Sequence, residues 1–187
     1  MIRLIRRILV VALAAVLLTG TAAVSADAMM QRTVMKQSGA TSPKHLKKAS
    51  KVKEGTTKLI FPKGEGHMKF TAPSTKTYRF TFSDMKVKGE TLAYVDFTKR
   101  DKTDPSKMVW LNVPTNGGKN TMLNLVSKGW SSITYNNPKV NRCLHSRYGK
   151  VKLKKGETVL IHFYSTQSEN YKEHKKVNKV TLKMVIK

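Results

Sequence analysis

The chain has 187 residues, of which 40% are hydrophobic, and its 36 basic and 11 acidic residues give a formal charge of +25. This length suits a single domain, and the apolar share is close to the globular average, which argues against wholesale disorder. A single cysteine excludes an internal disulfide framework and a structural zinc site made of cysteines alone. The few carboxylates leave little material for acid–base catalysis.

Residues 1–28 have the three-part layout of a secretory signal peptide. Arg3, Arg6 and Arg7 form a positive start, residues 8–18 form an unbroken apolar run, and Ala26-Asp27-Ala28 supplies an A-x-A cleavage motif. The apolar run is well short of the ~20 residues needed to cross a bilayer. We therefore expect a cleaved signal and a secreted protein, extracellular or associated with the cell wall, with no transmembrane segment after cleavage.

Residues 29–57 are rich in cations and poor in apolar side chains, and we expect a basic, flexible leader there. Ser42 and Pro43 can open a short helix. Lysine supplies 28 of the 36 basic residues, and lysine is a hydrated point charge rather than a reader of base edges. The composition therefore favours diffuse attraction to a polyanion. The candidate polyanion-binding residues are Lys44, Lys47, Lys48, Lys51 and Lys53.

From residue 58 to residue 187 the apolar pattern has a period of two, which is typical of strands with one buried face. Tyr78, Phe80 and Phe82 alternate with polar residues, and residues 180–186 alternate in the same way. Residues 158–164 are apolar on both sides, as in an interior strand. Short strand candidates separated by Gly, Pro and Asn turns predict an all-β, antiparallel, jelly-roll-like sandwich over residues 58–187, preceded by the signal-peptide helix and the leader.

Two stretches, residues 68–83 and residues 151–164, resemble the hairpins of bacterial pre-peptidase C-terminal (PPC-type) domains. In the first, Ala72-Pro73 turns the chain before an aromatic alternation, and in the second Gly156 makes the turn before a central strand. The resemblance covers about residues 58–187. It implies a β-sandwich that accompanies secreted enzymes as an accessory or surface-binding domain.

Aromatic residues in the loop-rich middle of the chain are candidates for stacking on sugar rings, with polar neighbours that can bind hydroxyls. The candidate ligand-binding residues are Trp130, Tyr135, Tyr148, Arg142 and Arg147. We place Trp110 in the core, because it lies in an apolar run. Trp130 has the alternative of closing one end of the sandwich.

No catalytic residue, metal ligand set or cofactor motif is predicted. Cys143 and His145 could share one face of a strand, but their segment is weakly patterned and an incidental thiol is the better interpretation. Asp96, Asp101 and Asp104 make a poor calcium cage, because lysine and arginine lie among them.

The sequence therefore predicts a non-enzymatic binding protein that associates, through lysine charge, with an anionic envelope or extracellular polymer. The alternative is a carbohydrate-binding module that uses exposed aromatic residues, and a third class is a small secreted hydrolase. We expect an anionic polymer or a glycan at the cell surface as the partner, no specific nucleic acid, and a monomeric chain.

Overall fold

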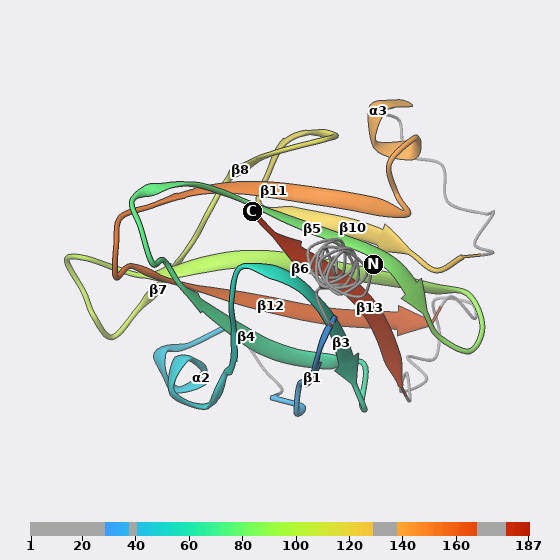
Figure 1. Ribbon diagram of the computed structural model, residues 1–187, viewed down its shortest axis with the longest axis horizontal. Coiled ribbons are helices and arrows are strands. Elements are labelled where there is room, and N and C mark those ends of the chain that lie inside the picture. The colour runs from blue at the N-terminus through green and yellow to red at the C-terminus, as the bar shows by residue number, and fades with distance from the viewer. Residues whose placement is uncertain (1–28, 38–40, 129–137, 168–178) are drawn as a thin grey trace, which may run out of the picture.

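The computed structural model describes residues 29–37, 41–128, 138–167 and 179–187. The predicted signal peptide, residues 1–28, lies outside the described residues. Two mostly antiparallel sheets pack face to face as a sandwich, as predicted (Figure 1). No helix in the described ranges is long and apolar enough to cross a membrane.

The seven-stranded sheet has the order β1-β3-β13-β5-β11-β8-β9, and the six-stranded sheet has the order β10-β6-β12-β4-β2 with β7 paired to β6. The strands are β1 Met30–Thr33, β2 Ser50–Val52, β3 Gly55–Phe61, β4 Glu65–Thr71, β5 Lys76–Lys86, β6 Thr91–Arg100, β7 Met108–Trp110, β8 Val113–Thr115, β9 Gly118–Asn120, β10 Met122–Val126, β11 Ser146–Leu153, β12 Thr158–Gln167 and β13 Val180–Ile186. The helices are α2 Pro43–Lys48 and α3 Pro138–Asn141.

The core lies between the sheets and is built from the alternating residues that the sequence indicates. Tyr78, Phe80 and Phe82 of β5 are fully buried. Their rings pack against rings of the opposite sheet: the ring centroids of Phe80 and of Phe97 on β6 are 5.3 Å apart. Strand β12 lies between β4 and β6, which confirms the prediction of an interior strand over residues 158–164.

The described parts of the segment expected to be a flexible leader, residues 29–37 and 41–57, are instead packed as part of the folded domain. Strand β1 pairs with β3 and strand β2 pairs with β4, both in parallel. Val34 and Val52 are buried in the main core, so isolated apolar residues that show no periodicity still anchor the segment. Helix α2 begins at Pro43 after Ser42, as predicted, and lies beside β4 (Figure 1).

Gly149 of β11 is needed because an aromatic ring fills the space that a side chain would take. A Cβ at this position would lie 2.8 Å from Cε2 of Phe97 and 3.1 Å from Cγ2 of Val113. Strand β11 can pack against Phe97 and Val113 here only because this position carries no side chain.

We predict that Gly149→Ala lowers the free energy of unfolding by about 1–3 kcal/mol, because overpacking the core outweighs the backbone entropy gained. Urea unfolding measures the change. Lys152→Ala, an exposed position on the same strand, is the control and should change the free energy by less than about 0.5 kcal/mol. Equal effects of the two substitutions would contradict the packing at Gly149.

Candidate functional site

The outer face of the six-stranded sheet, which points away from the core, carries a row of ionisable side chains. His67 of β4 pairs with His162 of β12, and His162 pairs with Asp96 of β6. Residues directly opposite each other on neighbouring strands share a face of the sheet. The adjacent row places Glu65, Tyr164 and Tyr94 beside them.

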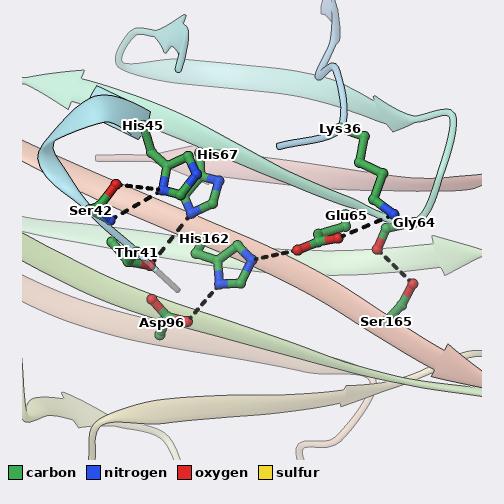
Figure 2. A network of polar contacts seen from close by, with 10 residues as sticks. All are labelled: Lys36, Thr41, Ser42, His45, Gly64, Glu65, His67, Asp96, His162 and Ser165. Carbon is green, nitrogen blue, oxygen red and sulfur yellow. Dashed lines mark hydrogen bonds and ion pairs between the residues drawn. The ribbon is translucent and has the colours of Figure 1, made fainter. Parts of the chain in front are cut away.

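Three histidines, which we call the histidine column, stack on this face: His45 of α2, His67 and His162 (Figure 2). The ring centroids of His45 and His67 are 4.3 Å apart, and those of His67 and His162 are 4.2 Å apart. The planes are tilted by only 6° and 10° respectively. The column therefore joins the helix to two strands of the sheet.

Two carboxylates flank His162. Its Nδ1 lies 3.2 Å from Oδ2 of Asp96, and its Nε2 lies 3.6 Å from Oε1 of Glu65. Asp96 is 1% exposed, and this burial raises the pKa of its carboxyl group, while the hydrogen bond to His162 acts in the opposite direction. Glu65 also pairs with Lys36, whose Nζ is 3.8 Å away (Figure 2).

His67, in the middle of the column, is completely buried. Burial, followed by the neighbouring His162 and His45, lowers the pKa of His67 from its ordinary 6.5 to about 3. Its Nε2 lies 3.5 Å from Oγ1 of Thr41. The ring is therefore kept neutral at physiological pH.

The column does not form a metal centre. Parallel rings direct their nitrogen lone pairs side by side, whereas a metal ion requires lone pairs that converge on one point about 2 Å away. Within the described ranges, no group of three or more His, Cys, Asp or Glu side chains could hold a metal ion. The column instead positions α2.

A second contact fixes the end of α2. Nζ of Lys69, on β4, donates to the carbonyl oxygens of Leu46 at 2.7 Å and Lys47 at 3.2 Å. A cation at the carboxyl end of a helix satisfies carbonyls that have no partner within the helix. At the other end, Nδ1 of His45 accepts the backbone N–H of Ser42 at 3.1 Å.

Helix α2, held in this way, forms one wall of a cationic hollow that we call the basic pocket. The pocket has a volume of about 410 Å³. Its lining residues are Pro43, Lys44, Lys47, Lys48 and Arg100. In the part of the chain that the structure describes, none of these four cations forms an ion pair. The residues that line the pocket therefore carry positive charge that no described carboxylate compensates.

Three of the five predicted polyanion-binding lysines, Lys44, Lys47 and Lys48, meet in the basic pocket. Lys51 and Lys53 are also exposed, on β2 and directly after it, but they do not line the pocket. Arg100, at the end of β6, was missed, because the sequence does not reveal that the ends of β6 and α2 meet.

The predicted sugar-binding group is not assembled by the described residues. Trp130 and Tyr135 lie outside them. The guanidinium of Arg79 lies 4.0 Å above the ring centre of Tyr148 and covers one of its faces. Arg142 is exposed, so it remains available.

Arg147, by contrast, does not reach the surface, since it is 1% exposed. Its Nη1 donates to Sγ of Cys143 at 3.0 Å, and the chain at Gly117 passes so close that a Cβ there would lie 2.5 Å from Nη1. Cys143 is a free thiol, half-buried, whose contacts are with Arg147 and the carbonyls of Lys139 and Val140. Among the described residues, Cys143 and His145 form no hydrogen bond with each other.

Two further expectations concern Trp110 and the aspartates. Trp110 was expected in the core, but it is 46% exposed, because β7 is a three-residue strand at the margin of the sheet and, among the described strands, pairs with β6 alone.

Asp101 and Asp104 stabilise their own turn: Oδ1 of Asp101 accepts the backbone N–H of Thr103 at 2.7 Å. Asp96 contacts a different partner, since its Oδ2 lies 3.2 Å from Nδ1 of His162.

Sequence reasoning also missed the histidine column. The one available signal was that His67 and His162 occupy the outward positions of strands whose inward neighbours are apolar. The register between β4 and β12, which makes the two rings neighbours, is set by the fold.

Comparison with protein-family models, with curated proteins and with solved structures found no match for this chain.

We predict that His67 makes the protein acid-sensitive. Because its pKa in the folded state is about 3, unfolding below pH 6.5 takes up a proton that the folded state does not bind. The free energy of unfolding is therefore unaffected by His67 well above pH 6.5. Below pH 6.5 it falls by at most about 1.4 kcal/mol per pH unit as the pH approaches 3. His67→Phe keeps a ring in the stack without the titration, so its stability should fall less steeply with acid.

Urea unfolding of both proteins at intervals between pH 7.5 and 4 tests this prediction. The raised pKa of Asp96 favours folding in acid, but it is present in both proteins, so the difference between the two profiles isolates His67. Parallel profiles would show that His67 titrates normally in the folded protein.

Proposed function

We propose that the protein is exported and binds an anionic polymer of the cell envelope or extracellular space at the basic pocket, without catalysis. The observation that supports this most directly is the pocket itself, in which three lysines of α2 and Arg100 gather with no carboxylate partner among the described residues. Like charges brought together repel one another, and a bound polyanion relieves that repulsion.

The charge of the whole chain supports the same proposal. A net charge of +25 produces a positive potential that attracts a polyanion from a distance, and salt screens this attraction over about 10 Å at 0.1 M. The basic pocket would then provide the local contacts. Lysines on a short helix suit a repetitive polymer, because point charges do not require one orientation of the anion.

The resemblance of residues 68–83 and 151–164 to PPC-type domains is consistent with this role, since those domains accompany secreted enzymes as accessory or surface-binding parts. In this chain the two stretches meet at their turns: the N–H of Ala72 donates to the carbonyl of Glu157 at 2.9 Å, and the N–H of Gly156 donates to the carbonyl of Ala72 at 2.8 Å.

The alternative, a module for neutral carbohydrate built on Trp130, Tyr135 and Tyr148, has less support. Arg79 covers one face of the Tyr148 ring, and the other two residues lie outside the described ranges. For a hydrolase, the best-placed pair is His162 with Asp96, but the two side chains are 8% and 1% exposed and a substrate could not reach them.

We predict that changing Lys44, Lys47 and Lys48 together to Gln weakens binding to a simple polyanion, inorganic polyphosphate, by about tenfold at 50 mM salt and reduces the salt dependence of binding. Titration of labelled polyphosphate at 50 and 300 mM salt measures both effects.

The control for this experiment changes Lys58, Lys150 and Lys152 to Gln. These lysines are exposed on the outer face of the seven-stranded sheet, so the control removes the same charge from the other side of the sandwich. Equal weakening by the two triple variants would mean that the net charge acts without a site, and the basic pocket would lose its role.

Export is tested by the mature N-terminus. If residues 1–28 are a signal peptide, the protein recovered from the culture medium or the cell wall should begin at residue 29, and N-terminal sequencing would find it there. Recovery of the uncleaved chain from the cytoplasm would contradict the proposed location.

A further inference from the structure

Trp110 is a large apolar side chain that the fold leaves 46% exposed. It lies on β7 opposite Thr98 of β6, and its neighbour two positions earlier, Met108, lies opposite Arg100. Side chains at alternate positions of a strand share a face, as do residues directly opposite on paired strands. Trp110 and Arg100 are therefore diagonal neighbours on the same face of the six-stranded sheet.

Helix α2 lies over that same face. Lys69, which binds the end of α2, pairs with Leu160, Leu160 pairs with Thr98, and Thr98 pairs with Trp110. One row of the sheet thus runs from beneath α2, across β12 and β6, to Trp110. With about 4.8 Å between neighbouring strands, the row spans roughly 14 Å. Arg100, on β6, lines the basic pocket together with α2, and Trp110 is its diagonal neighbour on the same face, outside the pocket lining.

The combination of separate cations and an exposed ring defines the chemistry of the occupant. Lysine and arginine bind carboxylate, sulfate or phosphate groups, whereas an indole binds a flat apolar surface such as the face of a sugar ring. Simple polyphosphate would contact only the cations, and a neutral glycan would contact only the indole. A polymer that carries both an anionic group and a ring in each repeat uses the whole surface.

We propose that the basic pocket and Trp110 together form a binding site for an acidic polysaccharide, with the anionic groups on Lys44, Lys47, Lys48 and Arg100 and a sugar ring stacked on Trp110. This inference rests on the proposed function and specifies its ligand. Single-stranded nucleic acid also combines charge with flat rings, but the excess of lysine over arginine and the predicted export favour the polysaccharide.

The test compares polygalacturonate, which has a sugar ring and a carboxylate in every repeat, with inorganic polyphosphate, which has charge but no ring. Trp110→Ala should weaken polygalacturonate binding about five- to tenfold and leave polyphosphate binding unchanged within twofold. Trp110→Phe, which keeps a flat ring, should restore most of the affinity. Titrations at one salt concentration, with unfolding curves to verify that each variant is folded, give these values.

Val109→Ala is the matched control, because Val109 lies on the same strand and is 44% exposed but points to the opposite face. This substitution should leave the binding of both polygalacturonate and polyphosphate unchanged. Unchanged polygalacturonate binding by Trp110→Ala, or equal losses on both probes, would overturn the stacking role while leaving the proposed polyanion site intact.

Two other results would also overturn the inference. If the unmodified protein binds neither polyanion, the proposed function fails and the inference fails with it. If single-stranded oligo-dT binds more tightly than polygalacturonate, with the same loss in Trp110→Ala, the site is one for nucleic acid.

Discussion

The attachment of α2 to the outer face of the six-stranded sheet is the contact on which the candidate site depends. A helix of six residues has no stability of its own in water, because nucleation costs more than so few hydrogen bonds return. Here the sheet supplies what the helix lacks: His67 stacks against His45, and the ammonium group of Lys69 binds the last carbonyls of the helix. Because these contacts fix the position of α2, they also fix the positions of the lysines that α2 contributes to the basic pocket.

The placement of the described carboxylates explains why none of them compensates the charge of the basic pocket. Glu65 and Asp96 flank His162, Glu157 pairs with Lys99 at 3.2 Å, and Asp104 pairs with Lys107 at 2.9 Å within its own turn. These acids pair with groups of the sheets and turns, and none of them pairs with a cation of the basic pocket. Because acids are scarce, each acid that pairs within the scaffold leaves fewer acids to pair with the remaining cations. The fold places four of these cations in the basic pocket.

The sequence predicted the sandwich scaffold, and it singled out three of the four cations that line the basic pocket. The alternation of Tyr78, Phe80 and Phe82 identified a half-buried strand, because the face that a side chain takes on a strand depends only on its neighbours in sequence. The prediction failed for residues 29–57, where Val34 and Val52 are too isolated to show a period yet are buried in the core. It also failed for Trp110, because the position of a strand within its sheet depends on which strands pair with it.

By itself, therefore, the sequence determined the charge of the protein, the scarcity of its acids and the two-residue period that makes it a sandwich, since these are properties of composition and of local neighbours. Only the tertiary structure decided that Arg100 joins the lysines of α2, that His45, His67 and His162 stack, and that Arg147 is buried. Each of these results requires segments far apart in the chain to come together, and that depends on strand order and register, which no local pattern encodes.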